Sequence, residues 1–443
     1  MASYFAADAL LPEGWARDVR IDVDAGGDIT GVTPAAQAEG AERLAGALLP
    51  GMPNLHSHAF QRAMAGLAEM RGATDDDFWS WRELMYQFAG RLTPPRARAI
   101  ATHLYIDMLQ HGYTAVGEFH YVHDGGPGML AQHLEAARDC GIAITLLPVA
   151  YQWSGFGKKP LLPRQARFQA GPDFILGLLH QFRTDLGPDI HAGVAPHSLR
   201  AVDPGSLKEL LAGLPKDAPI HIHAAEQTKE VEECAATLGR RPVEWLLENA
   251  AVDARWCLVH ATHMTAEETR ALARSGATAA ICPTTEANLG DGLFPLPAYR
   301  EAHGRWGMGS DSHVSRDPVE ELRLLEYGQR LLSRRRNVVS AGPSTAVGTT
   351  LWREAASSGP ALGRKMGSLA PGFRADFVVL DGEAPDLAGH RGDALANALL
   401  FSGTTGLVRD VAVAGRWVVR EGRHARAEAA AADFRRAVGE LLA

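Results

Sequence analysis

The most informative residues are two histidines separated by one serine, His56-Ser57-His58, directly after the apolar run ALLPGMPNL. On a β-strand, residues i and i+2 point the same way, so both imidazoles can bind one metal ion. Two histidines in an exposed loop would be the alternative. Other motifs later in the chain favour the metal site.

A third candidate ligand lies in HIHAAE, residues 221–226. We expect His223 to bind the same ion and His221 to be a structural histidine. Glu226, three residues further on, can reach the same place without binding the metal. A carboxyl group there could move protons to and from a substrate.

Two further motifs add acid–base groups. In HATH, residues 260–263, either histidine could be a ligand or a base, and we favour His260 over His263 because it directly follows the apolar run CLV. In GSDSH, Asp311 would be costly to bury unpaired. Beside a metal ion it would be both a ligand and a base for bound water; a helix N-cap is the alternative.

The elements that must position these residues are short apolar runs alternating with helix-like segments, which indicates parallel strands with crossover helices. Eight such runs are present: ALLPGMPNL before His56, then 113–121, 143–151, 190–199, 219–226, 256–263, 277–285 and 305–313. The sequence has no GxGxxG turn after the first strand and no P-loop, which argues against an open, doubly wound sheet.

The polar residues fall at or near the carboxyl ends of these runs, where a barrel places its active site. They are His56, His58, Glu118, Tyr121, His197, His223, His260 and Asp311. The sequence therefore predicts an α/β protein built on a (β/α)8 TIM-like barrel.

Both chain ends have a different character. Residues 1–49 and 366–425 contain short strand-like runs, with alternation of apolar and polar residues at 411–419. We expect them to form one smaller β-sandwich domain around a barrel at 50–365, with a C-terminal helix at 426–443.

Bulk properties narrow the class of protein. The net charge of −8 argues against nucleic acid and against an anionic membrane as the main partner. The four cysteines form no CxxC pair, the start lacks the pattern of a secretory signal, and no run approaches 18 apolar residues. We therefore expect a cytoplasmic enzyme.

The order of these motifs resembles the amidohydrolase superfamily: HxH on strand one, histidines on strands five and six, and aspartate on strand eight. The late segment GRKMGSLAPGFRADFVVLD fits as well. Binuclear members carry a bridging lysine, usually at the end of strand four. Here that strand ends in Pro196-His197-Ser198, so the resemblance implies a mononuclear, deaminase-like enzyme.

Longer motifs are similar to the N-formimino-L-glutamate deiminases of histidine degradation: LPGMPNLHSHAFQRAMAG, TDDDFWSWRELMY, EFHYVHD, GVAPHSLRAV and HIHAAEQTKEVEEC. This family converts N-formimino-L-glutamate and water into N-formyl-L-glutamate and ammonia. The resemblance implies one zinc ion on His56, His58, His223 and Asp311, with Glu226 and His260 as the proton-transfer and polarising pair. It also implies a homodimer and a set of substrate contacts: Gln61, Arg82, Tyr121, His197 and Arg200.

The chemistry of the substrate agrees with two arginines, because its two carboxylates suit bidentate guanidinium groups. Alternatives stay open: Arg82 stacking on a tryptophan, Arg200 pairing with Asp203, and His197 as a core histidine. Iron, manganese or nickel could also fit the ligand set. Trp79 and Trp81 lie on a long connection that either covers the site as a lid or anchors itself to the barrel.

Two other functions compete with this one. The first is a deaminase or chlorohydrolase of the same superfamily that acts on a heterocycle, against which the two arginines argue. The second is a non-catalytic ligand-binding barrel, which should have lost a metal ligand, and none is missing from this sequence.

Overall fold

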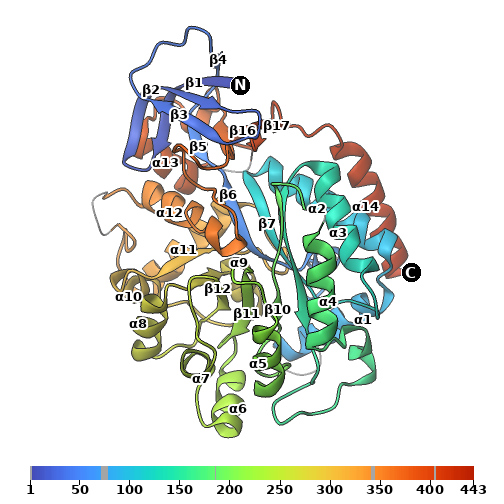
Figure 1. Cartoon of the computed structure of the whole chain (residues 1–443). Helices are drawn as coiled ribbons and strands as arrows, with labels where there is room; N and C mark the ends of the chain where they lie inside the picture. The colour runs from blue at the N-terminus through green and yellow to red at the C-terminus, as the bar shows by residue number, and fades with distance from the viewer. Residues whose placement is uncertain (1, 71–77, 185, 341–344, 404–405) are drawn as a thin grey trace.

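A closed barrel of parallel strands forms the centre of the computed structural model, which describes residues 2–70, 78–184, 186–340, 345–403 and 406–443 (Figure 1). Consecutive strands are neighbours, and the last pairs with the first through Met308 and Asn54. The strands are β6 (Met52–Ser57), β7 (Tyr113–His120), β8 (Ala143–Ala150), β9 (Ile190–Ala192), β10 (Ala195–Pro196), β11 (Ile220–Ala224), β12 (Trp256–His260), β13 (Thr278–Ile281) and β14 (Arg305–Met308). The predicted barrel is confirmed.

The fourth position of the barrel is shared by two short strands, β9 and β10. Between them a Cβ on Gly193 would lie 2.4 Å from the Pro219 carbonyl oxygen, so only glycine fits this close approach. Val194 then bridges Ile220 on β11, which closes the barrel. The break between β9 and β10 therefore brings the chain close enough to pair with β11.

Helices surround the barrel because each connection returns the chain to the start of the next strand (Figure 1). The α-helices are α1 (Phe78–Arg91), α2 (Pro94–Gln110), α3 (Gly128–Cys140), α4 (Pro172–Arg183), α5 (Pro204–Ala212), α6 (Thr228–Leu238), α7 (Pro242–Asn249), α8 (Ala266–Ser275), α9 (Pro283–Leu289), α10 (Leu296–Glu301), α11 (Pro318–Ser333), α12 (Val347–Ala356), α13 (Gly392–Phe401) and α14 (Ala427–Leu442). The 3-10 turns are η1 (Ala59–Met64), η2 (Pro163–Phe168), η3 (Gly359–Leu362) and η4 (Pro385–Leu387). No helix in these described ranges has the length and apolar character to cross a membrane.

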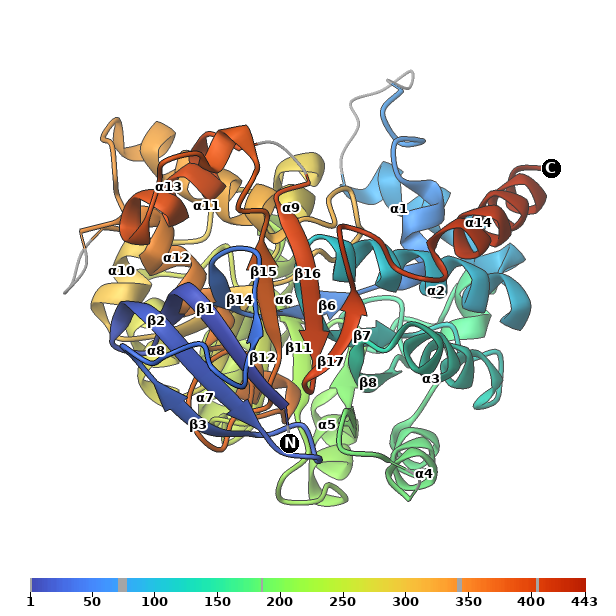
Figure 2. The same cartoon turned by 90° about the horizontal axis from the view of Figure 1, so that it is seen from above.

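Both chain ends contribute to a second β-domain, as predicted, and its strands form one mixed sheet (Figure 2). The antiparallel pairing of β15 with β5 joins the two ends. The strands of this second sheet are β1 (Ala2–Leu11), β2 (Gly14–Val23), β3 (Ile29–Thr33), β4 (Glu42–Arg43), β5 (Leu48–Pro50), β15 (Phe377–Leu380), β16 (Val408–Val413) and β17 (Arg416–Val419). Tyr4, Phe377 and Trp417 meet edge to face in its core.

We retain the domain boundaries after residues 49, 365 and 425 as a proposal. β5 pairs within the terminal sheet, whereas β6, one residue later, belongs to the barrel. Arg364 pairs with Asp376 across the 365/366 boundary at 2.9 Å, so the two parts share a buried ion pair.

Candidate active site

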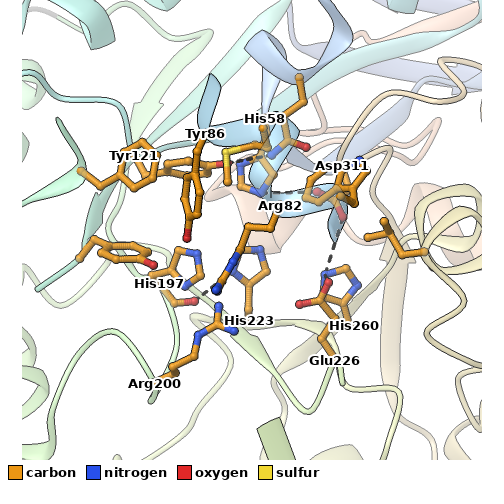
Figure 3. A pocket seen from close by; sticks show the side chains of 16 residues that line it. His58, Arg82, Tyr86, Tyr121, His197, Arg200, His223, Glu226, His260 and Asp311 are labelled. Atoms are coloured by element: carbon orange, nitrogen blue, oxygen red, sulfur yellow. Dashed lines mark hydrogen bonds and ion pairs between the residues drawn. The ribbon is translucent and has the colours of Figure 1, made fainter. Parts of the chain in front are cut away.

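Three imidazole nitrogens converge at the carboxyl ends of β6 and β11. The Nε2 atom of His56 lies 3.1 Å from Nε2 of His58 and 3.0 Å from Nε2 of His223. His56 and His58 share a direction because they are two residues apart at the strand end. His223 joins them from β11, with its ring near that of His58 (Figure 3).

The hydrogen bonds on the far side of two of these rings fix their tautomer. Nδ1 of His58 lies 2.8 Å from the Phe119 carbonyl oxygen, and Nδ1 of His223 lies 3.0 Å from that of His197. A carbonyl oxygen only accepts, so both rings donate through Nδ1 and direct an Nε2 lone pair at the shared point. Burial lowers the pKa of all three histidines, that of His56 to about 3, so the rings are neutral.

Asp311 completes this group from the loop after β14. Its Oδ1 atom lies 3.5 Å from Nε2 of His56 and 3.4 Å from Nε2 of His58. Burial opposes ionisation, but His56, His58 and His260 hold the pKa of this carboxyl well below its usual range. Lone pairs and a carboxylate that face one point repel one another unless a cation lies between them, and three imidazoles with one carboxylate are a typical zinc ligand set. The residues therefore fit a divalent metal ion.

The alternative role of Asp311 as a helix cap is wrong, because α11 is capped by Asp317, whose side chain accepts from the amide of Val319. The backbone of Asp311 instead pairs with the HxH segment: its amide donates to the His56 carbonyl and its carbonyl accepts from the His58 amide. Its φ of 48° is in the left-handed region, a strained conformation found often at functional sites.

Next to the ligand group lies an acid–base pair. Nε2 of His260 is 3.7 Å from Oε1 of Glu226 and 3.7 Å from Oδ2 of Asp311, so the three groups face the same space (Figure 3). Burial raises the pKa of Glu226 to about 7. Burial also opposes the charged form of His260, but Glu226, Glu286 and Asp311 raise its pKa to about 10.

Glu286, which no sequence motif indicated, contacts His260 on the side away from Glu226. Its Oε1 atom lies 3.2 Å from Nδ1 of His260 and accepts the amide hydrogen of Cys282 at 2.9 Å. Glu286 is in the first turn of α9, where an acidic residue is common for helix stability alone. For that reason the sequence around Glu286 did not indicate that this residue belongs to the site.

All five predicted substrate contacts line one pocket together with His58, His223, Glu226, His260 and Asp311 (Figure 3). These contacts are Gln61, Arg82, Tyr121, His197 and Arg200. The pocket wall also includes residues that no sequence motif indicated: Met85, Tyr86, Tyr151, Phe168 and Leu289. The structure thus brings the predicted residues together in one place, while their roles stay predictions.

The contacts of these residues bear on the alternatives that the sequence left open. The guanidinium of Arg82 lies over the ring of Tyr86, 5.5 Å from its centre. Asp203 caps α5 and pairs with Lys158 at 3.2 Å. Gln61 donates to the Tyr121 hydroxyl at 2.8 Å.

Other predicted positions are resolved as well. His221 is structural, as predicted, because its Nε2 donates to the Ala361 carbonyl at 2.8 Å within the core. Trp81 lines the pocket, whereas the side chain of Trp79 is outside the described residues. All four cysteines are buried and unpaired.

Glu118 does not reach the pocket, although it comes near the end of its strand. It is fully buried behind the HxH segment, where Oε2 accepts from Ser57 at 2.6 Å and from Tyr105 at 2.9 Å. Its Oε1 accepts from the amide of Ala59 at 2.9 Å. The expectation that Glu118 belongs to the mouth of the barrel is wrong, because the side chain points outward to α2.

Comparison with known proteins agrees with this geometry. Residues 47–418 match the model of the amidohydrolase family, and residues 1–46 match that of the N-terminal domain of formimidoylglutamate deiminase HutF. A formimidoylglutamate deiminase of Pseudomonas aeruginosa is 55% identical, with 100% of both chains covered. The chain belongs to the formimidoylglutamate deiminase family of amidohydrolases.

More distant members share the fold. A solved amidohydrolase from Brucella melitensis is 47% identical, with a TM-score of 0.94 and 100% coverage of both chains. An atrazine chlorohydrolase from Arthrobacter aurescens complexed with zinc has a TM-score of 0.84 at 21% identity, covering 99% of this chain and 100% of that one. A 5-methylthioadenosine/S-adenosylhomocysteine deaminase of Halobacterium salinarum is 28% identical over 84% of this chain and 81% of its own. Formimidoylglutamate deiminases thus share their barrel with enzymes that act on heterocycles.

Proposed function

We propose that this enzyme hydrolyses N-formimino-L-glutamate to N-formyl-L-glutamate and ammonia, a reaction of histidine degradation. The observation that carries the proposal is the presence of two guanidinium groups, Arg82 and Arg200, in the pocket that also contains the metal-ligand group. Two cationic forks suit a substrate with two carboxylates. The identity to a formimidoylglutamate deiminase over the full chain supports the same substrate.

We further propose that His56, His58, His223 and Asp311 hold one divalent ion, zinc. When bound, such an ion supplies Lewis acidity that lowers the pKa of a coordinated water. Metal analysis of the purified protein by mass spectrometry tests this: one zinc per chain is expected, whereas two metals per chain or a different metal would contradict it.

The protein's own groups perform the remaining chemistry. Asp311 takes a proton from the attacking water, whose oxygen forms a bond to the formimino carbon. His260, which Glu286 orients through Nδ1, polarises the reacting group and stabilises charge that develops on oxygen. Glu226 moves a proton to the terminal nitrogen. As the C–N bond breaks and ammonia leaves, the new hydroxyl group gives its remaining proton to Glu226 and becomes the formyl oxygen.

The contacts around the substrate restrict its position. Arg82 and Arg200 hold the carboxylates, while Gln61, Tyr121 and His197 provide neutral hydrogen-bonding groups closer to the ligand histidines. The ring of Tyr121 lies 5.0 Å from that of His58, and its hydroxyl group accepts a hydrogen bond from Gln61. The formimino carbon is thereby directed at the space between Glu226, His260 and Asp311.

A coupled assay for ammonia tests the function directly. We expect rapid release from N-formimino-L-glutamate, and none from guanine or cytosine, when zinc-loaded protein is used. The same assay with N-formimino-L-aspartate tests how strictly the pocket selects for the distance between the two carboxylates of its substrate. Release from a heterocycle alone would favour the second candidate, a heterocycle deaminase or chlorohydrolase, which the aromatic lining and the more distant relatives support.

The oligomeric state and the cellular location complete the proposal. A homodimer follows from the family resemblance and is tested by light scattering in solution, where a monomer mass would contradict it. A cytoplasmic location agrees with four unpaired thiols, which a reducing compartment preserves.

A further inference from the structure

A glutamine that the mechanism does not use lies behind the pocket wall. Gln165 belongs to η2, in the long connection between β8 and α4, and its side chain is fully buried. Its Oε1 accepts from the amide of Leu162 at 2.9 Å. Because a backbone amide can only donate, this bond settles which end of the side-chain amide is oxygen and which is nitrogen.

The nitrogen end of the same amide faces two tyrosines of the pocket. Nε2 of Gln165 donates to the Tyr86 hydroxyl at 2.9 Å and to the Tyr151 hydroxyl at 3.0 Å. An amide nitrogen carries two hydrogens, so both are used. With near-linear bonds, the two phenol oxygens are about 5 Å apart, too far to bond to each other.

The arrangement fixes the polarity of both hydroxyl groups. Each phenol oxygen accepts a hydrogen from Gln165, and its own hydrogen must therefore point elsewhere. Tyr86 and Tyr151 both line the pocket with Arg82 and Arg200, and Tyr86 extends toward Arg82 (Figure 3). Burial raises the pKa of Tyr86 to about 12, so its hydroxyl keeps the proton that it would donate.

We propose that Gln165 is a positioning residue that makes Tyr86 and Tyr151 donate hydrogen bonds to the carboxylates of the substrate. The inference rests on the proposed function and deepens it, because it adds two neutral donors to the two guanidinium groups. A hydroxyl group that could rotate freely would also accept hydrogen bonds, and would discriminate less between a carboxylate and an amide or ammonium group.

The exchange Gln165→Glu reverses this polarity with almost no change in shape. A carboxylate can still accept from Leu162, but it can only accept from the two tyrosines. Their hydrogens would then turn away from the pocket, and oxygen lone pairs would face the carboxylates of the substrate. The variants Tyr86→Phe and Tyr151→Phe remove the donors themselves.

The test compares steady-state kinetics of the zinc-loaded protein on N-formimino-L-glutamate with binding of glutarate measured by calorimetry. We expect Y86F and Y151F each to raise KM and the Kd of glutarate about 10-fold, the loss typical of a hydrogen bond to a charged group. Q165E should raise both about 10- to 100-fold, with kcat changed much less.

The combined variant Q165E/Y86F/Y151F separates positioning from simple charge repulsion. If Gln165 acts through the tyrosines, adding Q165E to Y86F/Y151F should change KM less than threefold. An equal effect of Q165E in both backgrounds, or an unchanged KM in Y86F/Y151F, would overturn the inference. Wild-type protein that binds glutarate through these tyrosines but releases no ammonia would instead overturn the proposed function alone.

Discussion

Replacement of Glu118 by alanine should weaken both the fold and the metal site, although Glu118 is not in the pocket. Its carboxylate accepts three buried hydrogen bonds, from Ser57, Tyr105 and the amide of Ala59. Two of these donors flank the ligand His58. The third comes from α2, so the carboxylate ties the HxH segment to the surrounding helices.

The size of the effect follows from the donors that lose the carboxylate. Each unsatisfied buried donor costs about 1–3 kcal/mol. The Ser57 hydroxyl also lies 3.0 Å from Nε2 of His313, and the Tyr105 hydroxyl lies 3.2 Å from Nδ1 of His133. These second partners recover part of the loss, so we expect a cost of about 2–4 kcal/mol. Burial raises the pKa of Glu118 to about 7, and this penalty on the ionised form offsets part of the loss near neutral pH. Because Ser57 lies between two ligands, we also expect zinc affinity to fall about 10- to 100-fold, as for other residues that orient metal ligands.

Urea denaturation of the zinc-loaded protein and competition with a chromophoric chelator measure the two effects. Glu118→Gln keeps the shape and an acceptor oxygen, so it should lose less than about 2 kcal/mol. Glu135→Ala is the matched surface control, because it removes only an exposed ion pair with Arg138 on α3. If Glu118→Ala changed stability and zinc affinity no more than Glu135→Ala, the supporting role would be refuted.

Four further predictions concern single residues. Glu226→Gln should retain zinc but lower kcat at least 100-fold, and an active variant would contradict its role in proton transfer. Asp311→Ala should abolish turnover and reduce zinc content, measured by mass spectrometry; full activity with full zinc would contradict both roles. Arg200→Lys should raise KM about 10- to 100-fold with a smaller change in kcat, because a lysine loses the bidentate fork. Burial raises the pKa of Glu321 to about 8, so between pH 5 and 8 the native state holds a proton that the unfolded chain has lost. Stability therefore falls as pH rises, by at most about 1.4 kcal/mol per unit, and Glu321→Gln should remove this slope in denaturation measurements at pH 5.5 and 7.5.

The residues at strand ends were predictable because two simple rules place them. Side-chain alternation sets His56 and His58 side by side, and the carboxyl ends of parallel strands meet at one face, which brings in His223, His260 and Asp311. The same reasoning failed for Glu118, since a residue near a strand end can point outward to the helices as easily as into the mouth.

Residues supplied by connections were not predictable in this way. Gln165 and Tyr86 come from η2 and α1, whose positions relative to the barrel depend on packing between segments distant in sequence. Neither lies in a periodic pattern that points to the pocket. Arg82 was identified only through the family resemblance, together with the chemistry of its substrate.

The partner of the Nδ1 atom distinguishes two of the ligand histidines, His58 and His223, from the acid–base histidine His260. His58 and His223 donate through Nδ1 to carbonyl oxygens, which are neutral and leave each ring a neutral donor with its Nε2 lone pair available to a metal. His260 instead meets the carboxylate of Glu286 through Nδ1. A carboxylate stabilises an imidazolium far more than a carbonyl does, so this ring can carry positive charge during the reaction. The ligand histidines and the acid–base histidine are the same residue type at similar strand ends. The group that accepts the Nδ1 hydrogen, a carbonyl oxygen or a carboxylate, gives them different chemistry.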